Sequence, residues 1–252
     1  MIHLKHLIKS FVSLLLLSFS IFIFANEMVM VEPARIVINN PQAKQPIQLK
    51  QVNITGTITG SIAKTQIELV LFNPNNLQLE GELQFPLLAN QTVSGFALDI
   101  NGEMRPAVAV EKALGQQVFE DVTRQKIDPA LLEKTNGNFY KLRVYPLPAG
   151  GTRTVRLEIS QTLSADQKNS ALYHLPLMFA QSIGQLNINL TIQTIAANKL
   201  NATLGAEKLT ATQAKGKSLI QFKQQNYQSK KKRSKSNKKF EFIVKLIKEY
   251  IL

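Results

Sequence analysis

Few side chains in this chain of 252 residues have the types and spacing that catalysis requires. Cysteine is absent, which excludes disulfides, thiolate metal sites and thiol nucleophiles. Of the three histidines, two lie within the first six residues, and only His174 remains for the rest of the chain. It lies in an apolar run typical of a strand, where a histidine is more often hydrogen-bonded or solvent-facing than part of a Ser-His-Asp triad. We therefore predict no catalytic residue and no enzyme, with an envelope hydrolase as the alternative.

A metal site would need clustered ligands, and the nearest approach to such a cluster is Glu120, Asp121 and Asp128. Calcium prefers several oxygen ligands, so these acids could bind it weakly. The alternative, which we adopt, is that they are helix-surface charges and a helix N-cap. No metal and no other cofactor is predicted. Tryptophan is also absent, which argues against a stacking platform for carbohydrate.

The chain from Val31 to about Phe222 alternates apolar and polar residues with a period of two. This period is typical of strands with one buried face and one wet face. The clearest examples are residues 66–71, 95–100, 154–159 and 186–193. Between two of the apolar runs, Asn101-Gly102 predicts a tight hairpin, because both residues can take positive φ. The pattern predicts an all-β fold, an antiparallel β-sandwich.

One segment, residues 111–124, departs from this period and predicts a short helix that crosses an edge or end of the sandwich. Its residues Leu114, Val118 and Val122 are spaced by four, so they form a stripe that can dock on the sheet. After this helix, Pro129 at a first helical position predicts a further turn or short helical piece.

An ordered series of short motifs runs through the middle of the chain. It includes Asn73, Glu80-Gly81-Glu82, Phe85-Pro86-Leu87, Glu111-Lys112-Ala113, Val118-Phe119-Glu120, residues 128–133, the strand 141–145 and residues 146–150. This series resembles the VIT (vault protein inter-alpha-trypsin) domain family over roughly residues 45–165. No single motif is specific, and the resemblance rests on their order and spacing. The signature positions in this sequence are Gly102, Glu111, Lys112, Glu120, Asp128, Pro129, Phe139 and Arg153.

The resemblance implies a β-rich, non-catalytic module of exported proteins that usually precedes a von Willebrand A domain. The Asp-x-Ser-x-Ser metal loop of that second domain is missing from the sequence, so metal-dependent adhesion is not expected. Most signature positions are expected to be structural, with Pro129 fixing a loop. A binding surface for a protein partner is predicted on the helix and the loop at Asp128, since loops often carry function.

The same resemblance predicts an ion pair across the contact between the helix and the sheet. The expected acid is Glu111 or Glu120. The expected basic partner is Arg153 or Lys112.

Residues 1–25 are predicted to be a signal peptide. Lys5 and Lys9 precede the apolar run 11–24, which is shorter than the roughly 20 residues that span a bilayer as a helix. Cleavage is expected after Ala25, with an uncleaved anchor as the alternative. The protein is therefore expected in the periplasm, the cell envelope or the medium. The predicted organisation is a signal peptide (1–25), a VIT domain (31–165), a β-rich extension (166–222) and a basic tail (223–252).

The net charge of +13 is concentrated in the tail, where residues 223–252 hold ten Lys or Arg against two acids. The central domain is nearly neutral, so nucleic-acid binding is not predicted. The tail has three interpretations. It is the product of a shifted reading frame in a truncated VIT–von Willebrand A surface protein, a disordered basic arm, or a membrane-retention tail. In the second case, residues 240–251 would form an amphipathic helix that binds an anionic membrane.

Overall fold

A computed structural model of the chain describes residues 33–107, 112–124, 130–135, 137–163, 170–193, 200–228 and 241–247. The described residues belong to one compact unit. The predicted signal peptide lies outside the described residues. No helix in the described part of the chain has the length and hydropathy of a membrane span.

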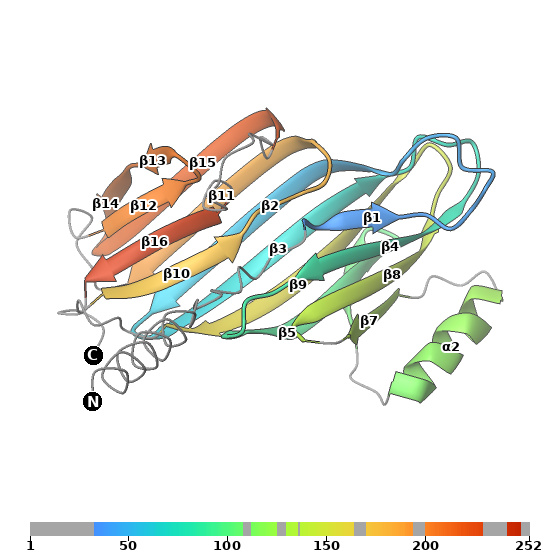
Figure 1. Cartoon of the computed structure of the whole chain (residues 1–252), viewed down its shortest axis with the longest axis horizontal. Coiled ribbons are helices and arrows are strands. Elements are labelled where there is room, and N and C mark those ends of the chain that lie inside the picture. The colour runs from blue at the N-terminus through green and yellow to red at the C-terminus, as the bar shows by residue number, and fades with distance from the viewer. Residues whose placement is uncertain are drawn as a thin grey trace, which may run out of the picture. The chain divides into compact units, whose positions relative to one another are not determined.

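The described part of the chain contains one helix and many strands (Figure 1). In order, these are β1 (Arg35–Val37), β2 (Gln48–Thr59), β3 (Ile62–Phe72), β4 (Leu79–Pro86), β5 (Gln91–Ile100), β6 (Glu103–Pro106), α2 (Lys112–Arg124), β7 (Ala130–Lys134), β8 (Phe139–Leu147), β9 (Thr152–Thr162), β10 (Ser170–Pro176), β11 (Ile183–Gln193), β12 (Leu200–Leu204), β13 (Glu207–Leu209), β14 (Ala211–Ala214), β15 (Lys217–Tyr227) and β16 (Glu241–Ile247).

The described strands form one large sheet and two small sheets. The large, eight-stranded sheet has the order β14-β15-β11-β2-β3-β9-β5-β6, and the small sheets have the orders β1-β4-β8-β7 and β10-β16-β12-β13. Both small sheets lie on the same side of the large sheet in Figure 1, and one core of buried apolar residues draws on all three. The predicted all-β sandwich with one short helix is confirmed.

The period of two explains the large sheet. In β2, Val52, Ile54 and Ile58 are at most 1% exposed, whereas Asn53 and Thr55 between them face away from the core. Burial of each such apolar side chain contributes about 1.5–3 kcal/mol, which is why the alternation decides which face turns inward. The outer face of the sheet is consequently polar.

The strands that follow the predicted VIT region belong to the same sandwich. β11 lies inside the large sheet, between β15 and β2. Its pairing with β2 is parallel, which departs from the antiparallel pairing predicted for the fold and found for the other named strand pairs of the described residues. The extension at 166–222 therefore supplies central strands rather than an appendage.

The predicted amphipathic helix at 240–251 is wrong for residues 241–247, which form strand β16. This strand lies between β10 and β12 and pairs antiparallel with both. Its residues Phe242, Val244 and Leu246 are 0% exposed. The alternative of a disordered tail is wrong for the same residues, because alternate side chains of β16 enter the core.

The first residues of the predicted tail are also structured, since β15 continues to Tyr227, which is 7% exposed. The lysine-rich residues 229–240 lie outside the described residues. The hypothesis that the tail binds a membrane through an amphipathic helix therefore has no support from residues 241–247. A truncation of residues 224–252 would not test membrane binding alone, because it would also remove a core strand.

Tyr173 of β10 is fully buried beneath the large sheet, and its hydroxyl shares a hydrogen bond of 2.8 Å with Thr65 Oγ1. Burial raises the pKa of Tyr173 to about 12, although the hydrogen bond with Thr65 acts in the opposite direction. A tyrosine in an unfolded chain has a pKa of about 10. Between these two values the folded protein keeps a proton that the unfolded chain loses, so the stability falls as the pH rises through this window.

The substitution Tyr173→Phe is expected to remove this dependence. The free energy of unfolding of wild type relative to Tyr173→Phe should fall by about 2 kcal/mol between about pH 9 and pH 12, measured by urea unfolding. Tyr145→Phe, on the outer face of β8, is the control and should leave the dependence in place. A difference between wild type and Tyr173→Phe that does not change with pH would contradict the expectation.

Candidate functional site

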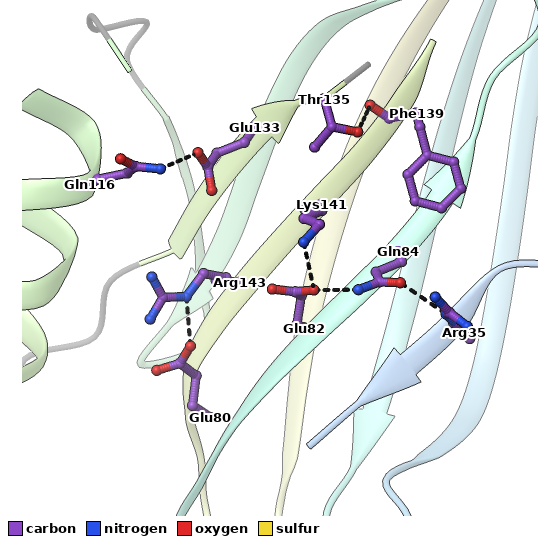
Figure 2. Close-up of polar contacts among 10 residues, drawn as sticks. All are labelled: Arg35, Glu80, Glu82, Gln84, Gln116, Glu133, Thr135, Phe139, Lys141 and Arg143. Atoms are coloured by element: carbon purple, nitrogen blue, oxygen red, sulfur yellow. Dashed lines mark hydrogen bonds and ion pairs between the residues drawn. The ribbon is translucent and has the colours of Figure 1, made fainter. Parts of the chain in front are cut away.

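The outer face of the small sheet β1-β4-β8-β7 carries a connected row of polar side chains (Figure 2). The strand register places Arg35 opposite Gln84 and Gln84 opposite Lys141. Gln84 Oε1 accepts a hydrogen bond of 2.8 Å from Arg35 Nε, and Gln84 Nε2 donates to Glu82 Oε1. Lys141 Nζ lies 3.6 Å from the same Glu82 oxygen. Three strands are thus joined by side chains as well as by their backbones.

Arg143, the next outward residue of β8, joins this sheet to helix α2. Its Nε donates to Glu80 Oε1 at 2.7 Å, and its Nη1 donates to Glu120 Oε1 of the helix at 2.8 Å. Partial burial of the guanidinium opposes its charge, but the hydrogen bonds and charges of Glu80 and Glu120 outweigh this effect and raise the pKa of Arg143. Arg143 therefore stays charged and binds Glu80 of β4 and Glu120 of α2.

Two further contacts hold α2 on the sheet. The ring of Phe119 is 2% exposed, and Arg143 Cζ lies 4.2 Å from its centroid. A cation over an aromatic face is attracted by about 0.5–1 kcal/mol at an exposed site and by more where water is excluded. Gln116 Nε2 donates to Glu133 Oε1 of β7 at 2.7 Å (Figure 2). The helix is consequently fixed at three of its side chains.

The helix was correctly predicted, but the face predicted to dock is wrong. Gly115 and Phe119 are the buried residues, whereas Leu114 is 51% exposed and Val118 is 49% exposed. Phe119 has more apolar area to bury than Leu114 or Val118, and it lies under the Arg143 guanidinium, so the helix rotates toward it. Two apolar side chains are thereby left on the outer face of α2.

The segment after the helix also differs from the prediction. A turn or short helical piece was predicted to begin at Pro129, whereas Ala130–Lys134 form strand β7, which pairs with β8. Of the signature positions, Glu111, Asp128 and Pro129 lie outside the described residues. Lys112 is the first residue of α2.

The predicted ion pair across the helix–sheet contact exists for Glu120, but its partner is Arg143, which was not among the expected bases. A signal was present in the sequence, because Arg143 lies in the strand 141–145 of the family-like series, opposite Glu82 in the register of β4 and β8. Only the pairing of these strands reveals it. Among the described residues no group of three His, Asp or Glu side chains is arranged to hold a metal.

Gly102 lies in the turn of the β5–β6 hairpin, on a different part of the sandwich, and Arg153 of β9 reaches the same hairpin with its side chain. Asn101 and Gly102 have φ of 55° and 84°, as predicted for the turn, and the Gly102 N–H donates to Asp99 Oδ1 at 2.8 Å. The Arg153 guanidinium donates to the carbonyl oxygens of Asp99 at 2.7 Å and Pro146 at 3.0 Å. Both signature positions therefore stabilise the same turn.

Phe139, at the start of β8, closes the β7–β8 connection. Its carbonyl oxygen accepts hydrogen bonds from the N–H of Thr135 at 2.8 Å and from Thr135 Oγ1 at 3.2 Å (Figure 2). Of the described signature positions whose side chains the structure defines, only Glu120 contributes to the helix contact. The structure does not gather them into one site.

Part of this chain matches a known family. Residues 49–160 match the model of the VIT family, the vault protein inter-alpha-trypsin domain. No curated protein matches.

Several solved structures are similar in fold at low identity. A candidate nutrient-binding protein from Legionella pneumophila is 10% identical with a TM-score of 0.46, and the match covers 85% of this chain and 71% of that one. An M1 zinc metallopeptidase from Deinococcus radiodurans is 12% identical with a TM-score of 0.42, over 83% of this chain and 44% of that one. A candidate protease from Parabacteroides distasonis is 11% identical with a TM-score of 0.43, over 79% and 40%. This chain thus spans less than half the length of these two proteins.

Proposed function

We propose that the protein is a non-catalytic protein-interaction module of an exported or cell-envelope protein, because its residues 49–160 match the model of the VIT family. The observation that carries the proposal is the outer face of α2, where Leu114 and Val118 are half exposed on a helix that is itself fixed to the sheet. In the larger context that the family suggests, the module would work beside a von Willebrand A domain.

The outer face of α2 has the composition of a small protein interface. Its two apolar residues are flanked by exposed polar ones, with Arg124 Nη1 lying 3.7 Å from Asp121 Oδ1. An apolar centre with a polar rim is the usual anatomy of such interfaces. Because the helix is already held by Phe119, little conformational entropy is lost when a partner binds. The expected partner is a protein that presents apolar side chains to this helix.

The double substitution Leu114→Asp/Val118→Asp is expected to weaken partner binding by about 2 kcal/mol, or roughly thirtyfold, because two charges would be buried in the interface. The partner is first isolated with the full chain from the envelope fraction of its source, and the affinities of the variants for it are then compared by calorimetry. The melting temperature should change little, since both side chains are half exposed in the folded protein.

Ile62→Asp is the matched control, because Ile62 of β3 is an apolar residue with a similar exposure of 44% on another element. It should bind the partner as wild type does. If the double variant also binds as wild type, the outer face of α2 is not the interaction surface. Charge reversal of Glu120 is a poorer test, because it would also break the contact with Arg143 that holds the helix.

A further inference from the structure

A second candidate surface lies on the outer face of the large sheet, away from α2. Side chains of β2, β3, β11 and β15 line a groove there with a volume of about 710 Å³. This volume falls within the roughly 300–1,000 Å³ that is usual for small-molecule sites. Adjacent strands lie about 4.8 Å apart, so the four strands give the groove a length of about 14 Å. Every residue that lines it belongs to the described part of the chain.

The register of the strands places the lining residues in rows across the sheet. One row runs through Lys223, Asn187, Asn53, Glu68 and Arg156, each opposite the next on the adjacent strand. The parallel pairing of β11 with β2 is what brings Asn187 beside Asn53.

A second row lies two residues away from the first on each strand. It runs through Gln221, Asn189, Thr55 and Gln66. Over β15, β11, β2 and β3, the two rows form an amide lattice: the side-chain amides and the Thr55 hydroxyl lie between the charged Lys223 and Glu68.

Hydrogen bonds among the amides hold them in defined orientations. Asn53 Oδ1 accepts from Gln51 Nε2 at 2.9 Å and from Asn187 Nδ2 at 2.7 Å. Asn187 Oδ1 in turn accepts from Gln185 Nε2 at 2.9 Å. Each primary amide has two N–H groups and an oxygen with two lone pairs, so these bonds use only part of its capacity. Oriented donors and acceptors remain for a ligand.

The groove carries few charges, and together with Arg156 beside it they leave one net positive charge. Glu68 is paired with Arg156, whose Nη2 lies 2.9 Å from Glu68 Oε2. The remaining charged residue of the lining is Lys223, at the opposite end of the row. So few charges give no strong electrostatic attraction for a polyanion. An apolar ligand is disfavoured as well, because it would displace the water that hydrogen-bonds to the amides and would offer no hydrogen bonds in return.

We propose that this groove binds a neutral oligosaccharide. Sugar hydroxyls both donate and accept hydrogen bonds, which matches the mixed donors and acceptors of the amide lattice. Phe222 of β15 borders the groove, but it lies opposite the buried Ile188 and packs against the core, so its ring is not offered to a sugar. The lack of tryptophan removes an extended stacking platform but not recognition by hydrogen bonds. This site is independent of the interaction surface on α2.

The test uses the full chain labelled with ¹⁵N and a panel of neutral hexasaccharides of glucose, xylose and N-acetylglucosamine. Binding of at least one of them should shift the side-chain amide signals of Asn53, Asn187 and Gln185 while leaving that of Asn76 in place. Asn76 is an exposed amide in the β3–β4 turn that does not line the groove. This measurement needs no substitution, so it does not depend on the folding of a variant.

The double substitution Asn53→Ala/Asn187→Ala should weaken that binding about tenfold or more, since two neutral hydrogen-bonding side chains are lost. Asn76→Ala should bind as wild type. A melting temperature close to that of wild type would show that the double variant is folded. Absence of shifts with the whole panel, shifts confined to residues outside the groove, or unchanged affinity in the double variant would overturn the proposal. Preferential binding of an anionic polysaccharide such as polygalacturonate would also overturn it.

Discussion

Asn73→Ala is expected to destabilise the protein by about 3 kcal/mol, because it would leave several buried backbone groups without partners. Asn73 is 0% exposed at the end of β3. Its Nδ2 donates to the carbonyl oxygens of Leu77 at 2.8 Å and Leu147 at 3.0 Å, and its Oδ1 accepts from the N–H of Asn75 at 3.0 Å. Asn75 then binds the backbone of Gln45, so the network joins three separate loops.

Urea unfolding of the purified variant measures this effect. Asn76→Ala, in the same turn but exposed, is the matched control and should change the free energy of unfolding by no more than about 0.5 kcal/mol. A decrease in the free energy of unfolding of less than about 1 kcal/mol for Asn73→Ala would mean that water enters the turn and replaces the hydrogen bonds of the missing amide.

Phe242→Ala should have a comparable or larger effect, with a loss of about 3–5 kcal/mol typical of a large side chain removed from a core. The Phe242 ring is 0% exposed and meets the Tyr173 ring edge-on, with centroids 5.9 Å apart. Because β16 pairs with both β10 and β12, the cavity would lie between strands that cannot easily close.

The matched control is Ile243→Ala, since Ile243 lies on the other face of the same strand and is only partly buried. Thermal unfolding followed by circular dichroism should show a much smaller decrease in melting temperature for this control. If Phe242→Ala unfolds as wild type does, residues 241–247 do not form a core strand, and the membrane-binding helix would regain its support.

The parts of the fold that the sequence predicted are those that depend on local pattern. The alternation in β2, β3, β9 and β11 decides which side chains are buried, and Asn101-Gly102 forms its turn because both residues tolerate positive φ. The order of motifs along the chain also indicated the VIT family before any three-dimensional information.

The predictions that failed concern residues whose apolar pattern fits two structures. The pattern fits either both a helix and a strand, or two different buried faces of one helix. The apolar residues of 240–251 fit a helical face, but Phe242, Val244 and Leu246 also fit a strand, and only the gap between β10 and β12 decides between them. In α2, a stripe through Leu114 and one through Phe119 are both possible by spacing.

The candidate sites depended on register between distant strands, which a single sequence does not contain. Asn53 and Asn187 are 134 residues apart and meet only because β11 enters the sheet parallel to β2. Arg143 likewise meets Glu80 and Glu120 from two other elements. Each of these polar residues on its own resembles an ordinary solvated strand residue.

Site-specific photo-cross-linking tests the central claim most directly. A benzophenone amino acid is placed at position 118 of α2 or, as the control, at position 62 of β3, and the cells that make the full chain are irradiated. The interaction surface proposed on α2 predicts a discrete cross-linked partner from Val118 and none from Ile62. No adduct at position 118, or the same adducts at both positions, would contradict it.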